Sequence, residues 1–178
     1  MARIMEAAVD VLASDPDASM AQIARRAGVV RATVYMHFPA REVLIEAVTE
    51  RAIAEATTAI HAAEPERGDA ADALRRVLAS AWRTLGRYHG LVAINTQLPN
   101  ADLRAKHHAV LAILEPLIKR GQREGTFRSD VPAAWHLSMV LALIHAASAE
   151  LRSGRVREES AESALQATIL GALGVSPG

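Results

Sequence analysis

Residues 19–38, SMAQIARRAGVVRATVYMHF, carry the clearest structural signal in this chain, because they contain the start, the stop and the spacing of two short helices. Ser19 precedes an apolar run and Gln22 follows three residues later, which is the pattern of a capping box. Gly28 stands where this helix should end, since glycine readily adopts the left-handed conformation of a C-terminal cap. A second helix is predicted over residues 31–37. Two short helices joined by a tight turn containing glycine are typical of a helix-turn-helix.

The apolar spacing divides this unit into an inward and an outward set of side chains. The residues expected to form a small shared core are Ile23, Ala24, Val29, Val34 and Phe38. The residues expected to face outward and contact DNA are Arg31, Ala32, Thr33, Tyr35, Met36 and His37, with Arg41 just beyond them. The major groove accepts one α-helix, whose N-terminal residues meet base edges. A core tyrosine and merely solvated arginines are the alternatives here.

The distribution of charge agrees with a DNA-binding surface, although the net charge of the chain is zero. Four arginines and no acidic residue occur between residues 18 and 41, whereas acidic residues precede and follow this window. A basic surface of this kind attracts phosphates.

Helical periodicity continues on both sides of the unit, so the predicted fold class is all-α. The predicted helices, about nine in all, cover residues 4–14, 19–27, 31–37, 40–63, 69–87, 91–98, 100–124, 130–153 and 158–173. Asp130 is expected to cap one of them, and Pro116 to kink another because proline removes a hydrogen bond. We expect an N-terminal three-helix domain over residues 1–48, a connecting helix and linker over 49–68, and a C-terminal helical domain over 69–178.

Composition and spacing exclude several classes of protein. The absence of cysteine excludes disulfides, thiolate zinc sites and cysteine nucleophiles. The seven histidines do not occur at metal-ligand spacings, so no metal and no cofactor are predicted. No glycine-rich phosphate loop, nucleophile elbow or catalytic acid pair is present, which argues against an enzyme. The longest uncharged stretch, residues 131–149, contains two histidines and two serines, so we expect a cytoplasmic protein without a membrane span.

Residues 4–48 resemble the DNA-binding domain of the TetR family of transcriptional regulators. The family pattern is roughly IAxxAGVSxGTLYxHFxxKExL, and residues 23–44 of this chain read IARRAGVVRATVYMHFPAREVL. Three positions depart from the pattern. Val30 stands where the family often has a serine that caps the recognition helix, Ala32 replaces a common glycine, and Arg41 replaces a common lysine.

The resemblance implies a ligand-responsive repressor that binds a palindromic operator as a homodimer and is released by a small organic effector. It also implies that the C-terminal domain holds an effector cavity among its middle helices and a four-helix dimer interface. Candidate cavity residues are Trp82, Tyr88, His89, His108, Trp135 and Met139, although for any single one of them a place in the ordinary core is favoured. Candidate interface residues are Leu137, Leu141, Ile144, Ser148, Leu165, Ile169 and Ala172.

Two other functions remain open from the sequence. One is a helical scaffold for protein partners, and the other is a small-molecule-binding enzyme without DNA activity. An enzyme needs polar side chains that converge on one site. A scaffold for protein partners has no need of a recognition helix that carries arginine. The uncharged helix at residues 131–149 favours burial on more than one side, which a second subunit would complete.

Overall fold

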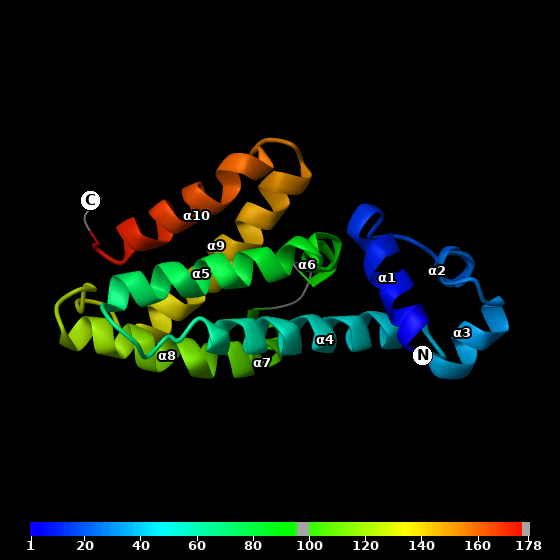
Figure 1. Cartoon of the computed structure of the whole chain (residues 1–178), viewed down its shortest axis with the longest axis horizontal. Helices are drawn as coiled ribbons and strands as arrows, with labels where there is room; N and C mark the ends of the chain where they lie inside the picture. Colours follow the sequence, from blue (N-terminus) through cyan, green and yellow to red (C-terminus); the bar gives the residue numbers. More distant parts are fainter. Residues whose placement is uncertain (96–99, 176–178) are drawn as a thin grey trace.

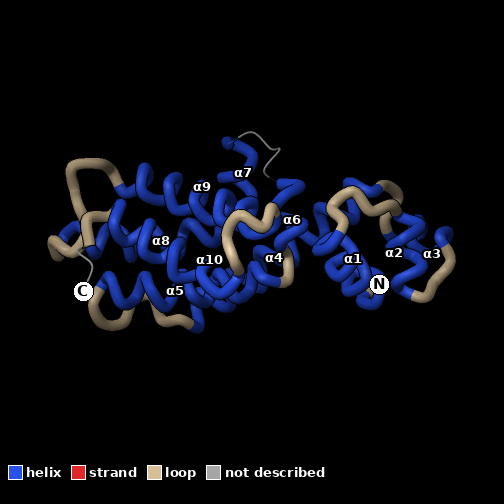
Figure 2. The backbone as a smooth tube through the Cα atoms, turned by 90° about the horizontal axis from the view of Figure 1, so that it is seen from above, coloured by secondary structure: helices blue, strands red, loops and turns tan. Residues whose placement is uncertain are grey.

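The computed structural model describes residues 1–95 and 100–175, and these residues form helices and connecting loops without a strand. Figures 1 and 2 show an elongated molecule with a small helical unit at one end and a larger bundle at the other. The helices are α1 (Ala2–Ser14), α2 (Met20–Ala27), α3 (Arg31–His37), α4 (Arg41–Ala62), α5 (Ala70–Gly86), α6 (His89–Asn95), α7 (Asn100–Lys106), α8 (His108–Arg123), α9 (Ala133–Arg152) and α10 (Glu158–Ala172).

The predicted capping signals of the N-terminal unit are confirmed. The Ser19 Oγ accepts a hydrogen bond from the Gln22 backbone at 3.3 Å, and the Gln22 side chain accepts one from the Ser19 backbone at 2.7 Å. Gly28 ends α2 with a φ of 65°, in the left-handed region. Ile23, Val34 and Phe38 are buried together with residues of α1, so α2 and α3 are braced against the first helix.

Helix α4 joins two hydrophobic cores. It contributes Leu44, Val48 and Ala52 to the core of the helix-turn-helix unit, whereas its Ile60 belongs to the core of the bundle. A helix of 22 residues is about 33 Å long. A displacement at one end of α4 is therefore transmitted to the other end as long as the helix stays straight.

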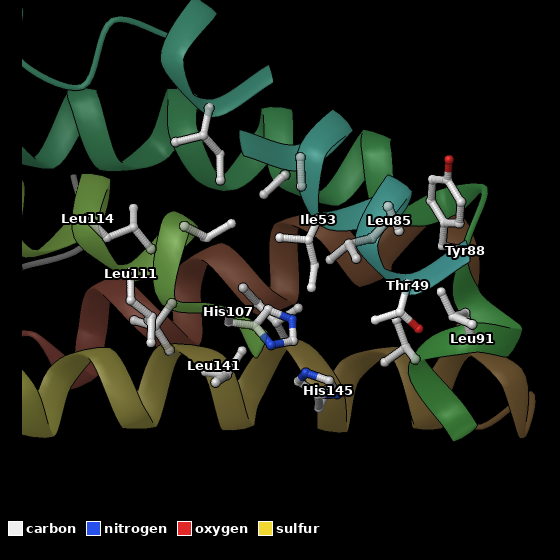
Figure 3. A pocket seen from close by; sticks show the side chains of 18 residues that line it. Thr49, Ile53, Leu85, Tyr88, Leu91, His107, Leu111, Leu114, Leu141 and His145 are labelled. Atoms are coloured by element: carbon white, nitrogen blue, oxygen red, sulfur yellow. The ribbon is translucent and has the colours of Figure 1, made fainter. Parts of the chain in front are cut away.

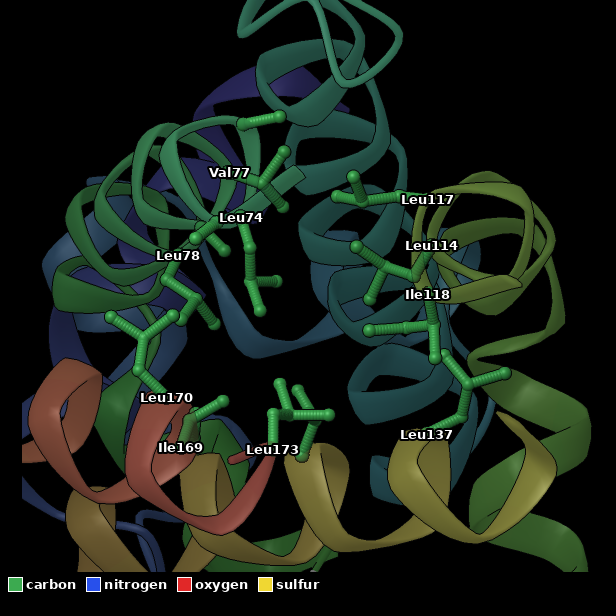
Figure 4. Close-up of a cluster of buried hydrophobic side chains, with 14 of the residues drawn as sticks. Leu74, Val77, Leu78, Leu114, Leu117, Ile118, Leu137, Ile169, Leu170 and Leu173 are labelled. Atoms are coloured by element: carbon green, nitrogen blue, oxygen red, sulfur yellow. The ribbon is translucent and has the colours of Figure 1, made fainter. Parts of the chain in front are cut away.

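The bundle core lies between α5, α8, α9 and α10. Figure 4 shows the side chains of α5, α8 and α10 pointing toward one another across this core, with Leu74, Ile118 and Ile169 among them. All three side chains are almost completely buried. Burial of these large aliphatic side chains contributes to the hydrophobic stabilisation of the bundle.

The described residues form ten helices where about nine were predicted, and the differences are local. The predicted helix over residues 100–124 is divided at His107, whose φ of −90° and ψ of 9° interrupt it. Pro116, which is predicted to kink a helix, lies inside α8. The prediction that Asp130 caps a helix is wrong: α9 begins at Ala133, and Asp130 pairs with Arg128. Pro132 explains the later start, because a proline disfavours helical geometry in the residue before it.

The recognition helix α3 lacks a side-chain cap, as the replacement of serine by Val30 suggested. Val30 is the N-cap residue, makes no capping hydrogen bond and is 70% exposed. We expect Val30→Ser to raise the free energy of unfolding by about 1 kcal/mol, because the serine hydroxyl can accept a hydrogen bond from an unpaired backbone N–H in the first turn of α3. Urea unfolding of this variant should be compared with that of Val30→Ala, which shortens the side chain without adding an acceptor. Equal stability of the two variants would contradict the capping argument.

Candidate DNA-binding surface and effector cavity

The outward face of α3 is presented to solvent at the end of the molecule away from the bundle (Figure 1). Arg31, Ala32, Met36 and His37 are exposed, and Met36 is 82% exposed. Tyr35 is partly exposed, at 36%, and Thr33 is half-buried. The buried position of α3 is Val34. The structure thus separates the two predicted faces as the apolar spacing indicated.

Arg31 and Tyr35 form a pair on this face. The Arg31 Nη2 donates a hydrogen bond to the Tyr35 hydroxyl at 3.0 Å, and the guanidinium lies 5.1 Å from the centre of the ring. The two residues are one helical turn apart, so the contact is local. A guanidinium over an aromatic face is attracted electrostatically, which limits the rotamers of a long side chain. The pair therefore presents an arginine that is already oriented.

Arg41 has a structural contact that the sequence did not reveal. Its Nε donates to the Ala18 carbonyl at 3.0 Å, and its Nη2 donates to the Pro16 carbonyl. Arg41 therefore ties the first turn of α4 to the turn between α1 and α2. A guanidinium has five N–H donors, so the N–H groups of Arg41 that make neither of these contacts can bind a ligand.

Two further arginines of this domain are occupied within it. Arg3 donates to the Ala27 carbonyl at 2.8 Å and so caps the end of α2. Arg26 forms an ion pair with Asp10 of α1 at 2.7 Å. These contacts stabilise the packing of α2 on α1, and they leave fewer arginines for DNA than the count in the sequence suggests.

A cavity lies in the bundle next to α4. Its volume is about 70 Å³, and its walls come from α4, α5, α6, α8 and α9. Figure 3 shows aliphatic side chains around most of it, including Ile53, Leu111 and Leu141. The polar residues that line it are Thr49, Tyr88, His107 and His145. The cavity is thus an apolar space with few hydrogen-bonding groups.

Two of these polar residues form a histidine pair. The rings of His107 and His145 have centroids 5.5 Å apart and are nearly perpendicular (Figure 3). Burial, with a smaller effect from His107, lowers the pKa of His145 to about 4. The His145 ring is therefore uncharged at neutral pH. Its Nδ1 is buried and has no hydrogen-bond partner within the described part of the chain.

The structure brings one of the six predicted cavity residues, Tyr88, to this cavity. Trp82 is buried in the bundle core and Met139 packs against that core, whereas His108 and Trp135 are exposed. The side chain of His89 lies outside the part of the chain that the structure describes. Burial, followed by the nearby Glu55 carboxylate, raises the pKa of Tyr88 to about 12. Sequence reasoning missed Thr49, His107 and His145, and no local pattern marks these three.

The predicted interface residues mostly face the inside of the protomer. Leu137, Leu141, Ser148, Leu165 and Ile169 are buried, and Ile144 and Ala172 are half-buried. The exposed side of α9 carries other small or apolar residues, and a groove between α9 and α10 is lined by Ala146, Ala164 and Thr168 among others. Of the predicted interface residues, Leu165 lines this groove.

Helix α9 is also long and apolar enough to cross a membrane by length and composition alone. A third of its most apolar window is buried inside the protomer. Helices α6, α8 and α10 pack against it. A core helix of a water-soluble bundle meets the same criterion, so this is weak evidence for a membrane span.

An ion-pair network near Tyr88 joins α1 to α4 and to the end of α5. Arg51 of α4 contacts Glu6 of α1 at 2.6 Å and Glu55 at 2.9 Å. Arg87, just after α5, contacts Glu6 at 3.3 Å and Glu55 at 3.5 Å. These carboxylates raise the pKa of Arg51 further above its already high value. The network links the first helix of the DNA-binding unit to the wall of the cavity.

Comparison with known proteins agrees with this arrangement. Residues 4–48 match the sequence model of the bacterial regulatory proteins of the tetR family. The chain is 30% identical to the transcriptional repressor LfrR of Mycolicibacterium smegmatis over 162 residues, which cover 88% of this chain and 81% of LfrR. It is 24% identical to the transcriptional regulator NfxB of Pseudomonas aeruginosa over 174 residues, 94% of this chain and 91% of NfxB.

Solved structures show the same fold. The structure of LfrR in complex with proflavine superposes with a TM-score of 0.75 and 26% identity, covering 96% of this chain and 94% of that one. The structure of PfmR from Thermus thermophilus has a TM-score of 0.74 at 22% identity, covering 99% and 100% of the two chains. The exposed recognition helix, the all-helical fold and the near full-length similarity to LfrR lead to one conclusion: this chain belongs to the TetR family of bacterial transcriptional regulators.

Proposed function

We propose that the protein is a homodimeric repressor that binds a roughly palindromic operator and is released by a small organic effector. The observation that carries the proposal is the exposed face of α3, where Arg31 is already oriented by Tyr35. A two-fold dimer matches a two-fold site, with adjacent major grooves about 34 Å apart. The similarity to LfrR, which is named as a repressor, supports the direction of regulation. A cytoplasmic location follows from the DNA partner.

We assign divided roles to the residues of the DNA-binding surface. Arg31 and Thr33 lie in the first turn of α3, where base edges are within reach. Tyr35 and Arg41 are assigned to phosphates, because the Tyr35 hydroxyl can still donate and Arg41 has unused N–H groups. Ala32, Met36 and His37 complete the surface that enters the groove.

A binding series tests these roles with Arg31→Ala, Tyr35→Phe and Arg41→Ala on operator and on scrambled duplex. We expect Arg31→Ala to cost about 1–3 kcal/mol on operator and much less on scrambled DNA, because a bidentate base contact is lost. Loss of a phosphate contact in Arg41→Ala should weaken binding to both duplexes equally and reduce the slope of log affinity against log salt by about 1. Tyr35→Phe should in addition weaken operator binding selectively, because it removes the hydrogen bond that orients Arg31. Unchanged operator binding by all three variants would overturn the assignment of α3. Circular dichroism serves as the folding control for Arg41→Ala, which also breaks the contacts to Pro16 and Ala18.

The size of the cavity suggests how an effector would act. Ligand pockets commonly measure about 300–1,000 Å³, whereas this cavity measures about 70 Å³. An effector must therefore push the walls apart, and α4 supplies Thr49, Ala52, Ile53 and Ala56 to these walls. Movement of α4 would reposition α3 in the dimer. The effector releases DNA only if it binds the displaced conformation more tightly than the operator-bound one.

The proposed dimer forms through the groove side of α9 and α10. That surface is apolar in its centre, and the protomer leaves it uncovered. Sedimentation at micromolar concentration should report about twice the chain mass of 19.0 kDa. A species that stays monomeric on concentration would contradict the proposal. The scaffold and enzyme alternatives are not favoured, because the curated relatives are transcriptional regulators.

A further inference from the structure

The charges around the cavity restrict the chemistry of its occupant. None of the described side chains that line it is acidic, and none is a lysine or arginine. Glu55 lies close to Tyr88, but its carboxylate is engaged by Arg51 at 2.9 Å and Arg87 at 3.5 Å. A charged group that enters the cavity would therefore find no counter-ion.

The cavity nevertheless has a specific place for a polar atom. His145 is 92% buried (8% exposed), lines the cavity beside His107, and has an unpartnered Nδ1. A buried polar atom without a partner is costly, and a ligand that supplies the missing hydrogen bond recovers that cost. A bare hydrocarbon cannot supply it. The Thr49 hydroxyl already donates to the Ile45 carbonyl at 2.8 Å, so it is not an equivalent site. The Tyr88 hydroxyl is also buried without a partner in the described part of the chain, but it points away from the other lining side chains (Figure 3).

We propose that the effector is an uncharged, apolar molecule with a single hydrogen-bonding head group, such as a hydroxyl, seated against the His107–His145 pair. This inference rests on the proposed effector function of the cavity and specifies the class of ligand. A hydroxyl suits the pair because it can both donate and accept, so it fits either tautomer of a neutral imidazole. The aliphatic walls receive the remainder of the molecule by removing its apolar surface from water.

The same geometry disfavours ions. Transfer of an ammonium or carboxylate from water into an apolar cavity is strongly unfavourable unless an opposite charge pairs with it. The low pKa of His145 means that this ring does not become a cation near neutral pH. The head group of the ligand therefore determines the selectivity of binding, whereas its alkyl chain contributes only apolar contacts.

Three probes that share one alkyl chain test this inference: 1-octanol, octanoate and octylamine. Binding to the full-length protein is measured by isothermal titration calorimetry at about pH 8, where both ionic probes are charged. We expect 1-octanol to bind at least about a hundredfold more tightly than octylamine, with octanoate also weaker than the alcohol. Octylamine or octanoate binding as tightly as 1-octanol would overturn the inference.

Two variants locate the binding to this site. His145→Leu removes the head-group partner at similar volume and should lower the affinity for 1-octanol by about three- to tenfold. His61→Leu, an exposed histidine of α4 outside the cavity wall, is the matched control and should leave the affinity unchanged. Ala56→Leu fills part of the cavity and should abolish binding of the alcohol. Thermal melting of each variant establishes that it is folded.

The outcomes separate this inference from the proposed function. If no member of the series binds the parent protein, the assignment of an uncharged alkyl head group is wrong. If 1-octanol binds equally well to the parent and to His145→Leu, the role of the histidine pair is wrong. In either case a different compound that releases operator from the parent, but not from Ala56→Leu, would keep the effector function. If 1-octanol binds as expected without weakening operator binding, the head-group inference stands and its link to repression fails.

Discussion

Replacement of Ala146 by glutamate is expected to convert the dimer into a monomer. Ala146 is exposed in the second half of α9 and lines the groove with Ala164 and Thr168 of α10. In a two-fold interface each substitution appears twice, so two carboxylates would approach the same apolar surface. Burial of unpaired charges costs several kcal/mol, which exceeds what a small interface can tolerate. The sedimenting mass should fall to that of one 19.0 kDa chain.

Operator affinity should fall with the loss of the dimer, because each monomer reaches only one half-site. Ala54→Glu is the control, since Ala54 is an exposed residue of α4 outside the groove. It should leave both the mass and the operator affinity unchanged. A dimeric Ala146→Glu protein would place the interface on another surface.

Among substitutions that add a single methyl group in the N-terminal half of the molecule, Gly90→Ala is expected to be the most disruptive. A Cβ on Gly90 would lie 1.7 Å from the Leu12 carbonyl oxygen and 2.6 Å from its carbonyl carbon. These are backbone atoms of α1, so no side-chain rotation can relieve the overlap. Helix α6 must then move away from α1, at a cost of about 1–3 kcal/mol or more. We also expect weaker operator binding, because α1 braces the helix-turn-helix core.

Gly86→Ala provides a matched control four residues earlier. Gly86 is the last residue of α5, and a Cβ there has no atom within 4 Å. This variant should gain about 0.5–1 kcal/mol, because alanine loses less backbone freedom on folding than glycine. Urea unfolding and operator titration of both variants measure the difference. Similar stability of Gly90→Ala and Gly86→Ala would show that α6 does not pack on α1 as described.

The opposite expectations for these two glycines depend on tertiary contacts. Both glycines lie in predicted helical regions or beside them, and the sequence does not distinguish them. The close approach of α6 to α1 involves residues 78 positions apart, Leu12 and Gly90. The same contact brings Leu91, a cavity residue, into the core of the DNA-binding unit.

The helix-turn-helix could be predicted from the sequence because its signals act over a few residues. The Ser19–Gln22 capping box spans four residues, and Gly28 adopts a left-handed conformation that suits glycine. The amphipathic spacing of α2 and α3 separated Val34 from Tyr35 and Met36 correctly. These features require no knowledge of the rest of the chain.

Only the tertiary structure determines which side of α9 is buried and which residues line the cavity. A helix that is apolar on all sides has no polar face to orient it, so Leu137 and Ala146 were equally plausible at an interface. His107 and His145 are 38 residues apart and meet only because α8 packs on α9. Arg41 likewise finds its carbonyl partners at Pro16 and Ala18, more than twenty residues away. Local capping and periodicity fix helices, whereas long-range packing determines which side chains share a cavity, a core or a surface.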